Sequence, residues 1–426
     1  MMEWARDGSV SADQRATFRF LVVVPFVLAI LSMIGPFSID TPFPAFPEMR
    51  DEFGASTRDL QLVVSVYLGS FALMSVFHGP LSDAVGRRPV MAVSLSVYVL
   101  GSIGAAFAPS LTWLLVCRSI QGISAGGATI ISRTVIRDMF EGAMAQKLMS
   151  RVSIIFGIGP ALGAIVGGWL LRLGDWPVIF VFQALFGVAL ILLVIFVLPE
   201  SHPPERRVSM HPMAVLGGLV QVGRRPSFVR LMLSAATIFG AQFLYIGGAA
   251  IFVVDVLGEG ERDFWKMFVP MIGSMMIGSW ICGRTAGRIT ARRLISIGCT
   301  TAFLGTVVAV IVASSPVATD LPWAVLGLAL IALGNGMCYP TFQLLMLDEV
   351  PERRGSVMSL SSCGVLILNS TVATAITPVV GHSALGFAVT SLVLVGAGLL
   401  CWSWHCALED RDVAVSGGLA EPTDLL

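Results

Sequence analysis

Long runs of apolar residues, separated by short polar segments, follow one another along almost the whole chain. A helix needs about 20 apolar residues to cross the hydrocarbon core of a bilayer. Runs of this length predict about twelve membrane-spanning helices, near residues 20–40, 60–78, 90–108, 111–135, 148–171, 178–198, 229–254, 265–283, 294–314, 323–346, 357–380 and 384–404. We therefore expect an all-α integral membrane protein.

The longest polar segment between these runs, residues 199–228, is rich in Pro, Arg and His and separates two sets of about six runs. The sequence therefore predicts an N-terminal six-helix bundle (1–198), a cytoplasmic central linker (199–228) and a C-terminal six-helix bundle with a short cytoplasmic tail (229–426). Residues 79–89, after the second run, have a degenerate counterpart at 283–293, after the eighth, which lacks the aspartate. Such an echo is typical of two pseudo-symmetric halves.

The chain has 426 residues, of which 55% are hydrophobic and only 13% are charged. Basic and acidic residues number 27 each, so the net charge gives no indication of a nucleic-acid partner. The sequence contains no phosphate-binding loop, no metal-ligand spacing and no nucleophile motif. We therefore expect neither an enzyme nor a bound metal or cofactor. The seven cysteines are scattered through the apolar runs as small hydrophobic residues.

Lys and Arg residues set the orientation of a membrane protein, because they are retained on the cytoplasmic side. Most of the 27 basic residues fall in the termini and in the even-numbered connections. This distribution predicts that both termini lie in the cytoplasm. The first apolar run is not followed by a small-residue cleavage site, so we expect it to remain in the mature protein.

Residues 79–89 form a short charged connection between the second and third runs. Gly79 and Gly86 let the backbone turn without a side-chain penalty. We expect Asp83 to accept hydrogen bonds at a helix N-terminus, and Arg87 and Arg88 to hold the connection on the inner side. An arginine pair alone is typical of any cytoplasmic loop, whereas the full pattern Gly-x-Leu-x-Asp-x-x-Gly-Arg-Arg is far more specific.

Arg118 interrupts the fourth apolar run. An arginine keeps its charge, so within a span it needs a carboxylate, a carbonyl group or a water-filled cavity. Gln121 shares its helix face, and Asp40, at the end of the first run, is the candidate partner. Burial disfavours the charged form of Asp40 whereas Arg118 favours it, so this carboxylate can take up and release a proton near physiological pH. The alternatives are a structural arginine that ties helices together and an interfacial acid at a helix end.

The fifth run contains Gly159, Pro160 and Gly163. Small residues permit close helix contact and proline kinks a helix, so the three residues predict a packing hinge, with a generic packing face as the alternative. Six polar residues within runs of the second half are candidates either for lining a mostly apolar cavity or for hydrogen bonds between helices: Gln242, Tyr245, Asn335, Tyr339, Gln343 and Asn369.

Taken together, these motifs resemble the Bcr/CflA drug-resistance branch of the major facilitator superfamily, over the whole chain and in the same order. Residues 79–88 are similar to the signature loop of the superfamily. The stretches that resemble the branch itself are Asp40 with Pro44 and Pro47 after the first helix, Arg118-Ser119-Ile120-Gln121-Gly122 in the fourth helix, the antiporter motif Gly159-Pro160-x-x-Gly163, and residues 351–356 after the tenth helix. In one departure, Ser32 stands where some multidrug members carry a membrane-embedded glutamate.

The resemblance implies a proton-coupled antiporter of the bacterial inner membrane that exports small amphipathic drugs by alternating access and works as a monomer. Asp40 and Arg118 would couple protons, whereas Gln121 and the six polar residues of the second half would line the substrate cavity. Residues 79–88 would form a cytoplasmic latch. A metabolite, sugar or organic-acid exporter or symporter on the same fold is an alternative, and a membrane-embedded sensor is another.

Overall fold

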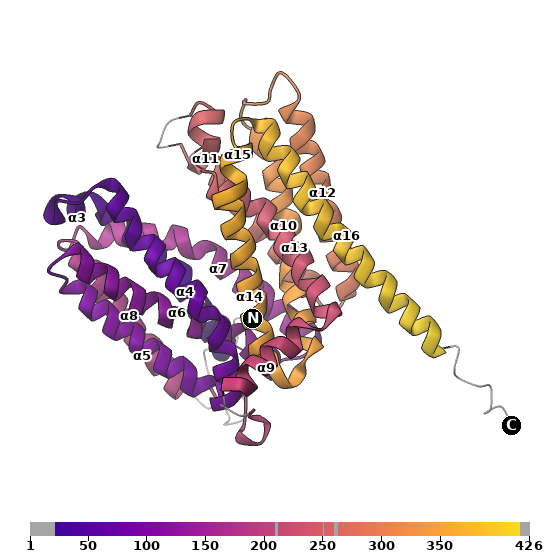
Figure 1. The fold of residues 1–426 in the computed structure, drawn as a ribbon, viewed down its shortest axis with the longest axis horizontal. Helices are drawn as coiled ribbons and strands as arrows, with labels where there is room; N and C mark the ends of the chain where they lie inside the picture. Colours follow the sequence, from indigo (N-terminus) through magenta and orange to yellow (C-terminus); the bar gives the residue numbers. More distant parts are fainter. Residues whose placement is uncertain (1–21, 209–211, 250, 260–262, 418–426) are drawn as a thin grey trace, which may run out of the picture. The chain divides into compact units, whose positions relative to one another are not determined.

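The computed structural model of the chain describes residues 22–208, 212–249, 251–259 and 263–417. Every regular element in these ranges is helical (Figure 1). The α-helices are α2 (Val24–Asp40), α3 (Phe46–Phe53), α4 (Thr57–Val85), α5 (Arg87–Ala106), α6 (Leu111–Met139), α7 (Gly142–Leu170), α8 (Pro177–Phe196), α9 (Pro212–Gly223), α10 (Pro226–Gly247), α11 (Trp265–Thr285), α12 (Ala291–Ala313), α13 (Trp323–Glu349), α14 (Arg354–Thr371), α15 (Thr377–Val380) and α16 (Ala384–Gly417).

In the described ranges, each of the predicted apolar runs overlaps a helix of at least 17 residues. Within the described ranges, nine helices are long and apolar enough to cross a membrane, or ten when the two segments of α7 count as one bent span. The runs at 265–283 and 357–380 coincide with α11 and with α14 and α15, which are helical but less apolar. Apolar runs fold in this way because a helix satisfies its own backbone hydrogen bonds in lipid. The predicted all-α membrane fold is confirmed, although the count of helices that meet this criterion is below twelve.

Two compact units make up the described chain. One contains residues 22–140 and 158–208, and the other contains residues 141–157 and the described residues from 212 onward. In the first unit, α4 and α5 pack on α6, and α8 packs on α5 (Figure 1). In the second unit, α13 packs on α11 and α12, and α16 packs on α10. The sequence ends, whose cytoplasmic location was predicted above, lie outside the described residues.

Helix α7 contributes to both units, because its residues 142–157 belong to the second unit and its residues 158–170 belong to the first. The helix is bent between the segments Gly142–Gly159 and Leu162–Leu170. Pro160 lies in this bent stretch, and its side chain is outside the described residues.

Aromatic side chains gather in the core of each unit. In the first unit, Trp176 packs edge-on against Phe180, with 6.0 Å between the ring centroids. In the second unit, the rings of Tyr245, Phe252 and Phe387 lie 5.0–5.2 Å apart. Such aromatic clusters bury large apolar areas in fixed geometry, so they give each unit a well-defined core.

The charged connection at residues 79–89 differs from the loop that the sequence predicts. Helix α4 continues through Gly79 to Val85, and α5 begins at Arg87, so Gly86 alone separates the two helices. Gly86 has a φ of 114°, a conformation that glycine adopts without the steric cost that a side chain would bring. The expectation that Asp83 lies at a helix N-terminus is therefore wrong, because Asp83 lies in the last turn of α4.

Candidate functional site

Arg118 of α6 is fully buried in the first unit. Its Nε donates to the Val63 carbonyl of α4 at 3.1 Å, and its Nη1 donates to the Ser38 carbonyl of α2 at 3.2 Å and to Gln121 Oε1 at 2.9 Å. The guanidinium also lies over the Tyr67 ring, 4.4 Å from its centroid. Carbonyl oxygens and an aromatic face therefore stabilise the buried charge.

Gln121 extends these contacts into a hydrogen-bonded network. Its Nε2 donates to Ser102 Oγ of α5 at 2.7 Å and to Gln183 Oε1 of α8 at 3.0 Å. Gln183 Nε2 donates in turn to the Ser38 carbonyl at 3.3 Å, and the Ser38 hydroxyl lies 2.6 Å from the hydroxyl of Tyr98. The network therefore ties α2, α5, α6 and α8 together around the arginine, and we call it the Arg118 network.

Sequence reasoning missed most members of the Arg118 network. Gln183 carries a usable signal, since an uncharged amide within an apolar run needs a buried partner. The serines carry none, because a helical serine can bond to its own backbone, as Ser102 does by donating to the Tyr98 carbonyl at 2.8 Å. Which hydroxyl also bridges helices depends on packing that a linear pattern does not contain.

Asp40 is the last residue of α2 and is half-buried, two residues beyond the Ser38 carbonyl that binds Arg118. The charges of Asp40 and Arg118 interact electrostatically. No ion pair joins the two side chains in the described part of the chain, and the Nη2 atom of Arg118 is buried without a hydrogen-bond partner. The structure thus brings Asp40 near Arg118 and leaves one donor of the arginine uncommitted.

Three glycines of α7, Gly159, Gly163 and Gly167, face the C-terminal half of α2 within the first unit. A Cβ added at Gly163 would lie 2.6 Å from the Phe37 carbonyl oxygen, and one at Gly167 would lie 2.1 Å from the Thr41 carbonyl oxygen. These distances are shorter than a carbon and an oxygen can approach without displacing the backbone. Residues four apart share one helix face, so the glycines let α7 pack directly on the end of α2.

Replacing Gly167 with Ala is expected to lower the free energy of unfolding by about 1–3 kcal/mol, because the new methyl group overpacks against the backbone of Thr41. The matched control is Gly168→Ala, since nothing lies within 4 Å of a Cβ at Gly168. Thermal unfolding of the purified variants in detergent measures both effects. Equal melting temperatures for the two variants would show that the close contact of α7 with α2 is absent.

A buried ion cluster holds the junction of α4 and α5. Arg87 is 1% exposed, its Nη1 donates to Asp83 Oδ1 at 2.6 Å, and its Nε donates to Asp138 Oδ2 at 3.0 Å. The Glu200 carboxylate accepts from the backbone N–H groups of Arg87 and Arg88, at 3.0 and 3.1 Å. Glu200 therefore takes the place at the N-terminus of α5 that the sequence assigned to Asp83. We call these five residues the junction cluster.

The segment after α8, which contains Glu200 and His202, contacts the other residues of the junction cluster. The ring of His202 is within hydrogen-bonding distance of the Asp83 carbonyl, with 3.1 Å between Nε2 and the oxygen. Burial and the positive charge of Arg87 lower the pKa of His202, which favours the neutral imidazole near pH 7. A Cβ at Gly86 would lie 2.8 Å from Glu200 Oε2, so the close approach of Glu200 to the helix junction also requires glycine at this position.

The second unit holds the remaining polar residues that the sequence singled out. Asn335 Nδ2 donates to Gln242 Oε1 at 2.8 Å, so these two amides are brought together. The oxygens Asn335 Oδ1, Gln343 Oε1 and Asn369 Oδ1 are buried and have no hydrogen-bond partner in the described residues. A buried acceptor without a donor is costly, so the three oxygens are suited to donors of a bound molecule.

The two tyrosines of the second unit lie in aromatic surroundings. Tyr245 belongs to the aromatic core described above and is 2% exposed. Tyr339 packs near Phe239, with 5.5 Å between the ring centroids. The tyrosine rings therefore contribute apolar surface in addition to their hydroxyl groups.

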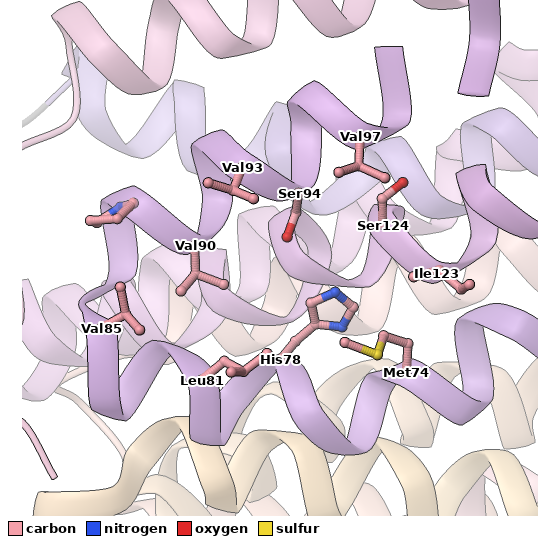
Figure 2. Close-up of a pocket in the computed structure, with 11 residues that line it drawn as sticks. Met74, His78, Leu81, Val85, Val90, Val93, Ser94, Val97, Ile123 and Ser124 are labelled. Carbon is pink, nitrogen blue, oxygen red and sulfur yellow. The ribbon is translucent and has the colours of Figure 1, made fainter. Parts of the chain in front are cut away.

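A cavity of about 350 Å³ lies between α4, α5 and α6 of the first unit (Figure 2). Apolar side chains line most of it, and Figure 2 shows the His78 side chain pointing toward Ser94 and Ser124. Gly126 and Gly127 of α6 make room for the imidazole, since a Cβ at either position would lie 3.0–3.1 Å from it. None of the residues that the sequence predicts for proton coupling or for a substrate lines this cavity.

The described residues contain no group of three or more His, Cys, Asp or Glu side chains that could hold a metal ion. Long apolar helices, a buried arginine network and a charged helix junction together define a polytopic membrane protein. The family model of the Major Facilitator Superfamily matches residues 28–371, and the chain belongs to this family. It is therefore a transporter of small molecules and not an enzyme.

Known relatives and structures agree with the family. The chain is 24% identical to the bicyclomycin resistance protein homolog of Haemophilus influenzae, over 82% of this chain and 86% of that protein. It is 25% identical to multidrug resistance protein D of Escherichia coli, over 88% of this chain and 94% of that protein. The crystal structure of the human organic anion transporter MFSD10 matches the fold with a TM-score of 0.70 at 19% identity, covering 91% of this chain and 99% of that one.

Proposed function

We propose that this chain exports small amphipathic drugs in exchange for protons across the inner membrane of a bacterium. The observation that carries the proposal is the fully buried Arg118, which has an uncommitted donor and, among the described residues, no carboxylate in an ion pair with it, near the half-buried Asp40. An intramembrane ionisable pair of this kind is a functional site by default, because burying its charges is costly. The names of the relatives, bicyclomycin resistance and multidrug resistance, support the class of substrate.

Asp40 is the proton-binding residue in this proposal. In the inward-facing state its carboxylate is deprotonated, and it accepts a hydrogen bond from Arg118 Nη2. The site then binds an amphipathic substrate from the cytoplasm. Protonation of Asp40 from the outside removes its negative charge, which weakens substrate binding and favours release. The two protonation states therefore supply the differential interaction that any conformational switch requires.

The polar residues that the sequence singled out provide the substrate contacts in this proposal. Gln121 belongs to the Arg118 network, whereas the orphaned oxygens of Asn335, Gln343 and Asn369 accept hydrogen bonds from hydroxyl or amide groups of the substrate. Gln242 orients Asn335, and the aromatic rings add apolar surface. A small molecule with several hydrogen-bond donors, such as chloramphenicol or bicyclomycin, fits this combination.

Two other sequence motifs, at the junction of α4 and α5 and in α7, have roles in the conformational change. The junction cluster acts as a cytoplasmic latch whose contacts differ between the inward-facing and outward-facing states, and Gly79 and Gly86 shape the helix ends on either side of it. Gly159, Pro160 and Gly163 form the hinge of α7. We place both termini in the cytoplasm and expect one chain to form a complete pathway, since a monomer contains both halves.

Drug accumulation in proteoliposomes under proton gradients of opposite sign tests the proposal. With an acidic interior, an antiporter accumulates labelled chloramphenicol as protons leave, and it does not when the gradient is reversed. Liposomes without protein are the control. Accumulation only with an acidic exterior would identify a symporter and would contradict the proposal, as would the absence of flux for every compound in a folded preparation.

A further inference from the structure

A second cavity, of about 320 Å³, lies within the second unit between the start of α7 and the end of α11. Four basic side chains line it: Lys147 and Arg151 from α7, Arg284 from α11, and Arg288 just after α11. Helices α7 and α11 are in close contact at this cavity: a Cβ at Gly283 of α11 would lie 2.4 Å from Ser150 Oγ of α7. The cavity therefore concentrates positive charge at a fixed place in the fold.

No ion pair to any of the four basic side chains occurs in the described ranges, although the guanidinium of Arg284 lies over the Trp280 ring, 5.9 Å from its centroid. The neighbouring Arg292, by contrast, has a carboxylate partner. Its Nη1 and Nη2 donate to the two carboxylate oxygens of Asp410 at 2.5 and 2.6 Å. The charge of the cavity thus has no counter-ion among the residues that the structure describes.

The sequence similarity between residues 79–89 and 283–293 explains why the cavity has an excess of positive charge. Gly287 has a φ of 77° and matches Gly86, which has a φ of 114°, so the two junctions align at their glycines. In that alignment Arg288 corresponds to Arg87, and Arg284 stands three residues before the glycine, at the position of Asp83. The first junction neutralises its arginine with internal carboxylates, whereas the second has an arginine, Arg284, at the position of the carboxylate.

A cluster of four cations repels itself unless an anion enters it. Phosphate is the anion that matches this set best, because its oxygens accept several charge-assisted hydrogen bonds, and arginine binds phosphate in a bidentate manner. The cavity lies at the start of α7 and the end of α11, and helix ends at the membrane surface meet lipid headgroups. Trp280 beside it is 58% exposed, as is typical of the membrane interface. Basic pockets between helices at this level bind phospholipid headgroups.

We propose that the cavity bounded by Lys147, Arg151, Arg284 and Arg288 binds a phosphate group, either of an acidic phospholipid headgroup or of free inorganic phosphate. The phosphate completes the ion pairs that the second junction lacks. It joins α7 to α11 as Asp83 joins α4 to α5 in the first junction, but with an exchangeable ligand in place of a side chain.

Binding of phosphatidylglycerol to the delipidated full-length protein in detergent tests this site, with phosphatidylcholine and inorganic phosphate as parallel probes. The wild-type protein is expected to bind phosphatidylglycerol and to melt at a higher temperature with it than with phosphatidylcholine. The double variant Arg284→Gln/Arg288→Gln is expected to bind about thirtyfold more weakly, since each basic residue near an anionic surface contributes several-fold to affinity. Arg293→Gln is the matched control, because Arg293 is exposed on the same segment and does not line the cavity.

The outcomes separate the two sources of phosphate. Binding of phosphatidylglycerol that millimolar phosphate does not displace assigns the site to lipid, whereas stabilisation by phosphate alone, lost in the double variant, assigns it to a soluble anion. Arg284→Lys/Arg288→Lys keeps the charge and is expected to restore part of the binding, and Lys147→Gln provides a second, surface-exposed test should the double variant not fold. Equal binding to wild type and to the folded glutamine variants, or no binding of either probe to wild type, would overturn the proposal.

Discussion

Replacing Arg118 with Met is expected to abolish proton-coupled transport while the protein still inserts into the membrane. Methionine keeps the apolar volume but removes the donors to the Val63 and Ser38 carbonyls and to Gln121. Gln121 Oε1 is then left without the donor that it has in wild type, and a buried acceptor in that state costs about 1–3 kcal/mol, so the network around it also loosens. Transport is measured in proteoliposomes, and folding is checked by size-exclusion chromatography and thermal unfolding.

The matched variants for this prediction are Arg118→Lys and Arg172→Met. Lysine keeps the charge but not the planar fork that reaches three acceptors, so we expect partial activity. Arg172 is exposed two residues after the end of α7, and its loss is expected to leave transport unchanged. Wild-type transport by a folded Arg118→Met variant would show that the arginine only ties helices together.

Replacing Arg87 with Ala is expected to cause the largest loss of stability, about 3–5 kcal/mol in the free energy of unfolding. The reason is that the variant removes the cation between two buried carboxylates, whose side chains are 0% exposed for Asp83 and 6% exposed for Asp138. Arg88→Ala is the control. Its side chain is only half-buried and donates to the Ile195 carbonyl, so a smaller loss is expected. Denaturant titration of the purified variants measures the difference.

A charge-balanced variant shows whether Arg87→Ala loses stability through unpaired charges or through lost packing. Arg87→Met combined with Asp83→Asn and Asp138→Asn removes all three charges together, so no carboxylate is left buried beside a missing cation. We expect this triple variant to recover part of the stability that Arg87→Ala loses. A triple variant that is less stable than Arg87→Ala would contradict the account of the junction cluster as a charge-compensated unit.

The fold was largely predictable because hydropathy acts locally. As far as the structure describes them, the predicted apolar runs are helical, since a run of that length in lipid has few other ways to satisfy its backbone. The helix ends were less predictable: the run ending near residue 78 continues as α4 to Val85, because polar residues at the end of a span extend the helix beyond the apolar core. The single-residue break at Gly86 depends on its backbone conformation, which residue type permits but does not require.

Residues of the candidate site could be predicted only where their type is unusual for an apolar run, as a charged residue is. Arg118 and Asp40 stand out as charges within or next to apolar runs, and Gln121 follows from helical spacing. Glu200 does not stand out, because it reaches the N-terminus of α5 across 113 residues of sequence. Ser38 contributes its backbone carbonyl, which every residue has. Contacts of this kind arise from packing and leave no local pattern.

The measurement that tests the central claim most directly is proton release from acid-loaded proteoliposomes when a drug is added, compared between wild type and Asp40→Asn. Asparagine keeps the shape of the side chain but cannot exchange a proton. The account predicts drug-stimulated proton release from wild type and none from Asp40→Asn, whose neutral side chain resembles the protonated aspartate and binds the drug more weakly. Proton release by Asp40→Asn at the wild-type rate would contradict the assignment of Asp40 as the coupling residue.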